Sequence, residues 1–363
     1  MSGRPILVMA GGTGGHVYPA LAVAQALQRE SRDIVWLGTH RGLESRVVPA
    51  AGINMEWISV RGLRRKGLIA TLIAPFQLCW ALIQSLLVIA RRRPAAVLGM
   101  GGFVSGPGGV AAWLTRRPLV IHEQNAAAGL TNRLLARLAR VVLQAFPGSF
   151  YSSVRAETVG NPVREDIAGV AQPAARYADR DGPLRLLVLG GSQGALALNR
   201  TVPAALALLP KDNRPVVRHQ CGSATIDAAR DAYARNEIDA ELVPFIEEMA
   251  SAYAWADLVV CRAGALTVAE LCAVGLPAVF VPYPAAVDDH QTANAQAMMQ
   301  VGAATIIQEC DLSDDSLAAV LRIWLRSRKE LRARAENARE LAKPHALERI
   351  TEICLQQAGA AVS

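Results

Sequence analysis

Paired cysteines, aromatic side chains and a signal-peptide core are absent or scarce in this sequence of 363 residues. None of the six cysteines forms a C-x-x-C pair, and their spacings suit neither a zinc site nor a disulfide framework, so we expect a reducing compartment. Aromatic residues make up 5% of the chain, which is too few for a protein that stacks single-stranded bases. Arg4 is followed by only six apolar residues before a glycine run, which is too short for a signal peptide.

Acidic residues are scarce in the first part of the chain. Residues 1–160 contain 6 Asp and Glu against 18 Lys and Arg, whereas residues 161–363 contain 25 against 20. The basic first part predicts an anionic partner, which can be nucleic acid, a phosphorylated substrate or a membrane surface. The length and the 52% hydrophobic residues predict two domains with buried cores and exclude a disordered or collagen-like chain.

Short apolar runs alternate with segments of helical spacing, which predicts an α/β fold with parallel strands. The first series of expected strands covers 6–9, 34–37, 96–99, 119–122 and 141–144, and the second covers 184–189, 216–219, 241–244, 258–261 and 278–281. We therefore expect two Rossmann-like domains facing a cleft. The first covers residues 1–161 and the second 162–343, with a Pro- and Gly-rich linker over 161–183. A C-terminal helix within 344–363 is expected to pack back on the first domain.

One uncharged run, residues 67–90, is long enough to span a membrane. Pro75 interrupts it, Gln77 and Gln84 share a helix face, and it lies inside the strand–helix series, so we expect a soluble helix over about 75–89 preceded by an apolar loop. Cations flank the run on both sides, at Arg61, Arg64, Arg65, Lys66, Arg91, Arg92 and Arg93. An apolar surface ringed by cations is typical of a site on anionic lipid. A buried helix with a solvated basic rim is the alternative that the sequence leaves open.

Glycine-rich loops follow three of the expected strands, at 11–16, 99–109 and 190–195. Such loops let backbone N–H groups face an anion at the positive end of a helix dipole. The first loop is no dinucleotide fingerprint, because Val17 stands where a third glycine is needed, and no Gly-Lys-Ser/Thr of a P-loop follows. A packing turn without a ligand is the alternative, and His16 at the helix start favours a ligand.

Polar residues also gather where strands end. The run 122–125, His-Glu-Gln-Asn, follows an apolar strand, at the sheet edge where open α/β folds bind ligands, and a helix N-cap near Asn125 is the alternative. Glu270 is expected in the second turn of a helix, where its carboxylate can accept hydrogen bonds from two ribose hydroxyls. A surface glutamate favoured by the helix dipole is the alternative, and the residue alone would favour it. Asp179 and Asp181 match the D-x-D of metal-dependent sugar transferases, but they follow no strand, so we expect a solvated loop and no metal.

Seven motifs, in order along nearly the whole chain, resemble the bacterial MurG transferases of glycosyltransferase family 28. They are Gly-Gly-Thr-Gly-Gly-His (11–16), Gly-Met-Gly-Gly-Phe-Val-Ser-Gly-Pro (99–107), His-Glu-Gln-Asn (122–125), Gly-Asn-Pro-Val-Arg (160–164), Gly-Gly-Ser-Gln-Gly-Ala (190–195), Arg-Ala-Gly-Ala-Leu-Thr (262–267) and Asp-Asp-His-Gln-Thr-x-Asn-Ala (288–295). The resemblance implies the glycosyltransferase B fold and a metal-independent, inverting transfer without a cofactor. The donor would be UDP-N-acetylglucosamine, and the acceptor the 4-hydroxyl of an undecaprenyl-pyrophosphoryl-linked N-acetylmuramoyl-pentapeptide. It also implies peripheral attachment to an anionic membrane surface, at the cytoplasmic face of the inner membrane, and no nucleic-acid partner.

The resemblance further implies roles for single residues. The nucleotide-sugar contacts would be Thr13, Gly14, Gly15, Asn125, Arg164, Ser192, Ile246, Ala265, Leu266, Thr267, Val268, Ala269, Glu270 and Gln291. Ile246 would lie near the uracil, Glu270 would hold the ribose, and Ser192 with the helix start at 265–267 would face the diphosphate. His16 and Glu123 are the candidate catalytic bases, and His16 is favoured because an ordinary imidazole titrates near neutral pH. A glycolipid synthase, a UDP-N-acetylglucosamine epimerase and a basic nucleic-acid-binding protein remain the alternatives.

Overall fold

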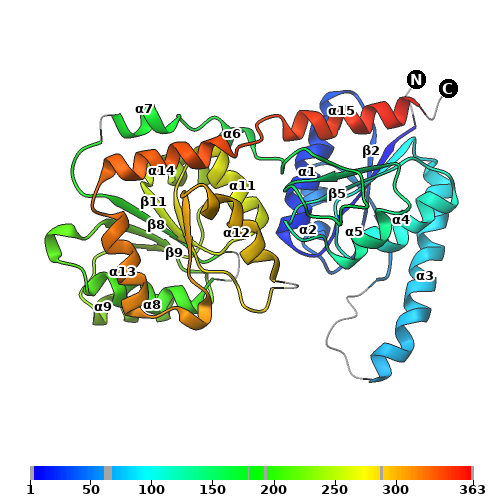
Figure 1. Ribbon diagram of the computed structural model, residues 1–363. Helices are drawn as coiled ribbons and strands as arrows, with labels where there is room; N and C mark the ends of the chain where they lie inside the picture. The colour runs from blue at the N-terminus through cyan, green and yellow to red at the C-terminus, as the bar shows by residue number, and fades with distance from the viewer. Residues whose placement is uncertain (1–3, 61–67, 179, 192–193, 287–288, 361–363) are drawn as a thin grey trace. The chain divides into compact units, whose positions relative to one another are not determined.

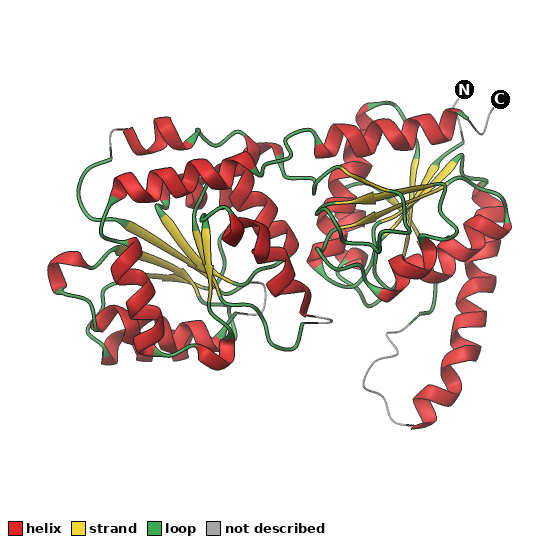
Figure 2. Ribbon diagram, viewed as in Figure 1, coloured by secondary structure: helices red, strands yellow, loops and turns green. Residues whose placement is uncertain are grey.

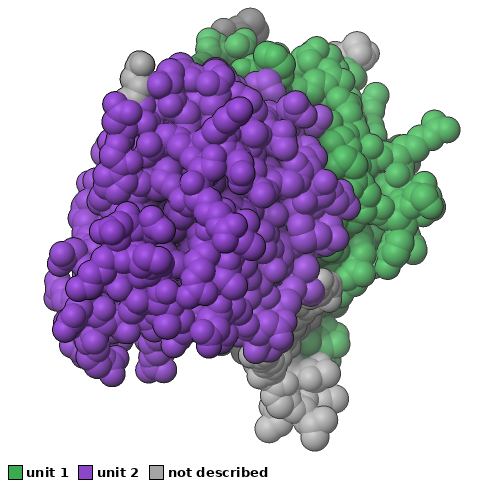
Figure 3. Space-filling model, turned by 60° about the vertical axis from the view of Figure 1, so that its left-hand side comes forward, with its two compact units in different colours: residues 1–162, 345–363 green, residues 163–344 purple. Residues whose placement is uncertain are grey.

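The structure is a computed structural model that describes residues 4–60, 68–178, 180–191, 194–286 and 289–360, with the backbone alone for 68–73. It divides into two compact units (Figure 3). Unit 1 comprises residues 1–162 and 345–363, and unit 2 comprises residues 163–344. Each unit contains one parallel sheet with helices on both faces (Figures 1 and 2). The expected pair of parallel α/β domains is therefore confirmed.

Unit 1 is built on a seven-stranded sheet with the order β3-β2-β1-β4-β5-β6-β7, in which every neighbouring pair is parallel. The strands are β1 (Ile6–Met9), β2 (Ile34–Gly38), β3 (Asn54–Trp57), β4 (Ala96–Gly99), β5 (Leu119–Glu123), β6 (Val141–Gln144) and β7 (Ala156–Thr158). The helices are α1 (Gly14–Arg29), α2 (Glu44–Ala50), α3 (Leu68–Arg92), α4 (Ser105–Leu114), α5 (Leu130–Leu135) and α15 (Ala346–Gly359).

The central strand β1 shows why this sheet carries helices on both faces. Its four residues are all fully buried, and alternate side chains enter different cores. Ile6 and Val8 pack in a cluster with residues of α1 and α15, whereas Leu7 and Met9 pack in a cluster with residues of α3 and α4. The C-terminal helix α15 thus belongs to the core of unit 1, and its Arg349 also forms an ion pair of 2.7 Å with Glu157.

Unit 2 is built on a six-stranded parallel sheet with the order β10-β9-β8-β11-β12-β13. The strands are β8 (Arg185–Leu189), β9 (Val216–Gln220), β10 (Glu241–Val243), β11 (Leu258–Cys261), β12 (Ala278–Phe280) and β13 (Ala304–Ile306). The helices are α6 (Glu165–Ala168), α7 (Pro173–Ala178), α8 (Leu196–Ala207), α9 (Ile226–Arg235), α10 (Met249–Trp255), α11 (Ala265–Val274), α12 (His290–Gln300), α13 (Asp314–Trp324) and α14 (Arg328–Glu340). Two short 3₁₀ turns cover Lys211–Asn213 and Glu309–Asp311.

Three strands and two helices were not expected from the sequence. The strands β3, β7 and β13 lie at sheet edges and carry few fully buried residues, so their apolar pattern is weak. The expected linker over 161–183 contains α6 and α7. It is fixed to unit 2 because Arg176 is buried and donates to the main-chain oxygen of Val274 at 2.8 Å.

Helix α3 is longer than expected. The sequence predicted an apolar loop before Pro75, but the helix runs through this proline from Leu68. A proline removes one backbone hydrogen bond and deforms a helix locally, and here it does not end the helix. Over 74–92 this helix is long and apolar enough to cross a membrane by length and composition alone, and 22% of that window is buried in the structure.

Candidate active site

The first glycine loop connects β1 to α1 and is held from behind by a buried carboxylate. Glu44, which is fully buried, accepts a hydrogen bond from the amide of Gly12 at 3.0 Å and two from Thr39, at 3.0 Å from its amide and 2.9 Å from its hydroxyl. On the other side of the loop, Gly12, Thr13 and Gly15 are exposed at the start of the helix. The expected ligand contacts Thr13, Gly14 and Gly15 thus lie together at a helix N-terminus.

The second glycine-rich stretch, residues 99–109, packs directly against the first loop. Gly101 and Gly102 have positive φ angles of 94° and 81°. A Cβ atom at Gly101 would lie 2.6 Å from Nδ1 of His16, and one at Gly102 would collide with the main-chain oxygen of Gly11. Only glycine allows these two loops to approach each other, which gives two of the glycines in this stretch a packing role.

His16 lies in the first turn of α1, at one end of a chain of polar side chains. Its Nδ1 is 2.9 Å from Oε1 of Gln124, and Nε2 of that amide is 3.1 Å from Nδ1 of His122. Nε2 of His122 is 2.9 Å from the main-chain oxygen of Gly160. Burial lowers the pKa of His122 to about 4, so this imidazole is neutral at physiological pH. Gln124 and His122 had no role predicted from the sequence.

Glu123 ends β5 and is 2% exposed. Its Oε1 accepts from the amide and the side chain of Asn125, at 3.0 and 3.2 Å, and its Oε2 accepts from the amide of Gly129 and the side chain of Asn132, at 3.1 and 2.8 Å. Both candidate bases and Asn125 are therefore in unit 1, at the carboxyl end of its sheet. The two oxygens of Glu123 are occupied in holding the turn that follows β5.

The third glycine loop follows β8 in unit 2 and is held by Gln220 at the end of β9. Oε1 of Gln220 accepts from the amide of Gly191 at 3.0 Å, and its Nε2 donates to the main-chain oxygens of Gly191 and Pro244, both at 3.1 Å. Several predictions concern residues outside the described part of the chain: Ser192 and Gln193 of this loop, Asp288, and the four cations Arg61, Arg64, Arg65 and Lys66.

Glu270 lies in the second turn of α11, as expected, and belongs to a cluster in unit 2. The hydroxyl of Tyr253 donates to its Oε2 at 2.8 Å. Burial raises the pKa of Glu270, while the Tyr253 hydrogen bond and the charge of Arg164 act in the opposite direction. Arg164 at the start of α6 and Glu270 are thus brought together, and Tyr253 is a further member of this cluster that was not predicted from the sequence.

The remaining expected contacts of unit 2 lie around the start of α11 and the loops beside it. This helix begins at Ala265 without a side-chain cap or an acidic residue in its first turn. Of its first five residues, Leu266, Thr267 and Ala269 are half-buried, whereas Val268 faces the core. Oε1 of Gln291 accepts from the amides of Ala263 and Tyr283 at 3.2 and 2.9 Å, and so fixes the loop that leads into α11. Ile246, which follows β10, is half-buried.

In the loop that holds the D-x-D match, Asp181 is exposed as expected for a solvated loop, whereas Arg180 between the two aspartates is largely buried. Its side chain is 10% exposed and forms an ion pair with the fully buried Asp257, because that carboxylate needs a charged partner away from water. Asp179 lies outside the described residues. In the part of the chain that the structure describes, no group of three or more His, Cys, Asp or Glu side chains is arranged to hold a metal ion.

Comparisons with known proteins agree with the two-unit architecture. Residues 6–144 match the glycosyltransferase family 28 N-terminal domain, and residues 185–350 match the glycosyltransferase family 28 C-terminal domain. A protein of Alkalilimnicola ehrlichii named UDP-N-acetylglucosamine--N-acetylmuramyl-(pentapeptide) pyrophosphoryl-undecaprenol N-acetylglucosamine transferase is 59% identical over 98% of this chain and 99% of its own length. A protein of the same name from Nitrosococcus oceani is 55% identical over 97% and 98%.

A solved structure is similar to this chain in its fold as well as in its sequence. The crystal structure of MurG from Acinetobacter baumannii matches with a TM-score of 0.85 and 40% identity, and the match covers 97% of this chain and 99% of that protein. The chain therefore belongs to glycosyltransferase family 28 and, within it, to the bacterial MurG transferases.

Proposed function

We propose that this chain transfers N-acetylglucosamine from UDP-N-acetylglucosamine to the 4-hydroxyl of a lipid-linked N-acetylmuramoyl-pentapeptide, with inversion, in peptidoglycan synthesis. The observation that carries the proposal is the identity of 59% along almost the full length of a relative whose name states this donor, this acceptor and the transfer of N-acetylglucosamine. The polar groups described above give each part of the reaction a candidate residue. The proposal needs no metal, no cofactor and no nucleic acid.

His16 is the base in this proposal. In the reaction the acceptor hydroxyl attacks the sugar carbon while the bond to the diphosphate breaks, and the hydroxyl proton must be taken up. Glu123 is the other candidate, but each of its oxygens already accepts two hydrogen bonds from the turn that follows β5. His16 is only partly buried at the end of an exposed loop, so its Nε2 is the better acceptor of a substrate proton.

Unit 2 supplies the nucleotide contacts. We assign the ribose hydroxyls to Glu270, because Tyr253 holds one of its oxygens and no described residue is bonded to the other. The amides at the start of α11 and the guanidinium of Arg164 would stabilise the charge that builds up on the leaving diphosphate. Ser192, Ile246 and Gln291 complete the proposed set, with Ile246 against the uracil.

A membrane-binding surface on unit 1 would bring the enzyme to its lipid acceptor. One face of α3 exposes Phe76, Trp80, Ile83 and Leu87, which recur with helical spacing and are between 47% and 76% exposed. The opposite face, which includes Ala81, Ser85 and Val88, is buried. Figure 1 shows the amino-terminal half of α3 projecting from the rest of unit 1. The two alternatives that the sequence left open, a buried helix and a membrane surface, would then apply to opposite faces of the same helix.

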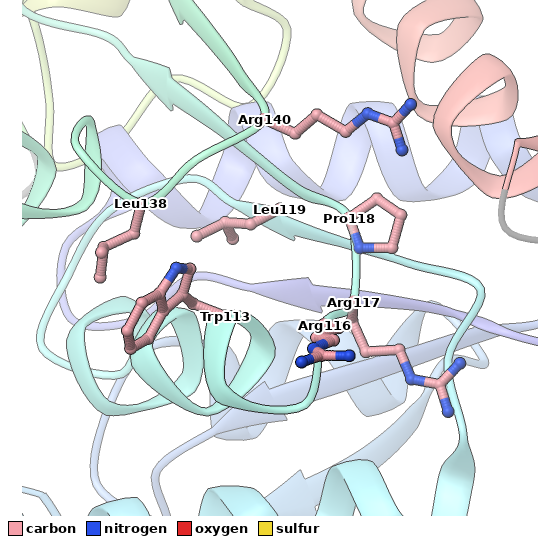
Figure 4. Close-up of a pocket in the computed structure, with 7 residues that line it drawn as sticks. All are labelled: Trp113, Arg116, Arg117, Pro118, Leu119, Leu138 and Arg140. Atoms are coloured by element: carbon pink, nitrogen blue, oxygen red, sulfur yellow. The ribbon is translucent and has the colours of Figure 1, made fainter.

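Arginines surround a hollow close to this helix. Helix α3 packs against α4, whose last turn exposes Trp113 and Leu114. The hollow, of about 250 Å³, is lined by Trp113, Arg116, Arg117, Pro118, Leu119, Leu138 and Arg140 (Figure 4). Burial and the charges of Arg4 and Arg93 lower the pKa of Arg117, so these cations are close together and would gain from an anionic lipid. Arg91 and Arg92, by contrast, are both paired with Glu56.

A transfer assay with labelled UDP-N-acetylglucosamine and a short-chain lipid-linked acceptor tests the activity. We expect a labelled disaccharide product, and release of UDP only when this acceptor is present. Product formed on diacylglycerol instead would indicate a glycolipid synthase, and conversion of the sugar without an acceptor would indicate an epimerase. A folded protein that gives no transfer, but binds RNA with a steep salt dependence, would contradict the proposal.

Vesicle flotation tests the membrane surface. The double variant Phe76→Ser and Trp80→Ser should reduce binding to anionic vesicles at least tenfold, because burying each aromatic side chain contributes about 2 kcal/mol. Ile323 of α13 in unit 2 is a matched control, since it is 52% exposed and lies outside the proposed surface. Ile323→Ser should bind vesicles as the unmodified protein does. Equal binding of all three proteins would contradict the proposed surface.

A further inference from the structure

Hydrogen bonds connect His16 through Gln124 and His122 to the main-chain oxygen of Gly160. The donor and the acceptor of the last of these hydrogen bonds are fixed. The main-chain oxygen of Gly160 can only accept, so the contact of 2.9 Å with Nε2 of His122 requires a proton on that nitrogen. His122 is fully buried and neutral, because burial lowers its pKa to about 4. A neutral imidazole with a proton on Nε2 has none on Nδ1, so Nδ1 of His122 is an acceptor.

The orientation of the Gln124 amide follows from two acceptors that face the same end of it. One is Nδ1 of His122 at 3.1 Å, and the other is the main-chain oxygen of His122 at 3.3 Å. The NH₂ group of Gln124 must lie at this end, because both neighbours accept hydrogen bonds. Its carbonyl oxygen therefore faces Nδ1 of His16 at 2.9 Å.

A carbonyl oxygen at this distance requires a donor, so the proton of neutral His16 is on Nδ1 and its Nε2 is unprotonated. The approach is possible because residue 101 is glycine, since a Cβ there would lie 2.6 Å from this Nδ1. Without such a partner, an imidazole in water favours the opposite tautomer, with the proton on Nε2. That tautomer could not accept a proton at Nε2.

We propose that Gln124 and His122 are positioning residues that hold His16 in the tautomer with the proton on Nδ1, and so keep Nε2 free to take the proton of the acceptor hydroxyl. The inference rests on the proposed function only for the identity of that hydroxyl. In the step, the hydroxyl oxygen forms the bond to the sugar carbon, the bond from that carbon to the diphosphate breaks, and UDP leaves with the electron pair. The hydroxyl proton moves to Nε2 of His16, while Nδ1–H continues to donate to Gln124.

The tautomer can be measured directly by ¹⁵N NMR on the full chain labelled in histidine, without substrate. The chain has six histidines, and His16→Ala identifies the resonances of His16 by their loss. We expect the unmodified protein to show His16 with the proton on Nδ1. In Gln124→Met, which keeps the length of the side chain but has no carbonyl, the other tautomer should become populated and kcat should fall about tenfold or more, while the KM for UDP-N-acetylglucosamine stays within twofold.

Gln144→Met is the matched control. Gln144 is a buried glutamine in β6 of the same sheet and donates to Thr158 at 3.0 Å, so the variant loses a buried amide hydrogen bond that is not part of the chain from His16 to Gly160. It should change neither the tautomer nor kcat. A purely structural role of Gln124 would lower stability equally in both variants and leave the tautomer of His16 unchanged.

Two results would overturn the inference. One is a spectrum of the unmodified protein with the His16 proton on Nε2, which needs no variant to fold. The other is a folded Gln124→Met protein that keeps both the tautomer and kcat. Failure of the proposed function is a separate result, because the tautomer is measured without any reaction, whereas a missing transfer product leaves it unaffected.

Discussion

The two glycine loops that follow the first strand of each unit are similar in sequence but are supported differently. The first reads Gly-Gly-Thr-Gly-Gly-His (11–16) and the second Gly-Gly-Ser-Gln-Gly-Ala (190–195). A buried carboxylate, Glu44, accepts from the amide of the first loop, whereas a neutral amide, Gln220, both accepts from and donates to the second. The final residue is His16 in the first loop and Ala195 in the second.

This difference indicates that the two loops have different roles. A carboxylate behind the first loop makes it a poorer place for a phosphate, and the histidine at its end suits proton transfer. A neutral support behind the second loop leaves the partial positive charge of its helix start for a diphosphate. The net charges of the two parts of the chain point in the opposite direction, so the groups next to each loop are the better guide to its ligand.

The largest effect is expected from removing the base. His16→Ala should lower kcat by about 10²-fold or more, because general base catalysis contributes about this much. UDP binding should stay unchanged, since His16 is in the loop to which we assign no nucleotide phosphate. Turnover measured with saturating donor, together with calorimetric titration of UDP, separates the two effects.

Near-normal turnover of His16→Ala would indicate that Glu123, and not His16, is the base. Glu123→Gln is the companion variant, and its effect should come with a loss of thermal stability, because two of the four hydrogen bonds to this carboxylate need an acceptor that the new amide nitrogen cannot provide. A loss of stability without loss of turnover per folded molecule would support the structural role of Glu123.

The sequence predicted the strands next to the site well and the supports of the loops poorly. Strands such as Ile6–Met9 and Leu258–Cys261 were predicted to the residue, because continuous buried apolar runs between glycine turns are a strong signal. Glu44 and Gln220 were missed because each is an isolated polar residue, and only the fold brings it to a loop far along the chain. Gln124 stood inside a motif, but its role depends on His122 and Gly160, which are contacts that spacing does not reveal.

A change of pH is expected to have an intermediate effect, on the stability of the protein. The effect depends on one buried histidine near each of the two loops. Burial lowers the pKa of His122 to about 4 and that of His219, next to Gln220, to about 3. The unfolded chain takes up a proton on each below about pH 6.5, and the folded protein does so only at much lower pH. The contribution of these two histidines to stability should therefore be constant above about pH 7 and fall by about 2 kcal/mol per histidine between pH 7 and pH 5.

Urea unfolding at the two pH values checks this, with His219→Phe as the variant. Nε2 of His219 has no hydrogen-bond partner among the described residues, so phenylalanine loses only the contact of 3.0 Å between Nδ1 and Tyr233. The variant should lose about half of the pH dependence, whereas His345→Gln, at an exposed position, should keep it. An unchanged pH dependence in His219→Phe would show that this imidazole is not held neutral.

The smallest effect is expected from exchanging the supports of the two loops. Gln220→Glu puts a second acceptor opposite the main-chain oxygens of Gly191 and Pro244, where the amide now donates at 3.1 Å, and adds a negative charge behind the loop. UDP affinity should fall about tenfold, or about 1.4 kcal/mol, which is the usual size of one hydrogen bond to a charged group. Glu44→Gln should leave UDP affinity within twofold, because Glu44 supports the other loop. If Glu44→Gln instead changes UDP affinity more than Gln220→Glu does, in proteins with unchanged melting temperatures, the diphosphate belongs to the first loop and the roles of the two loops are reversed.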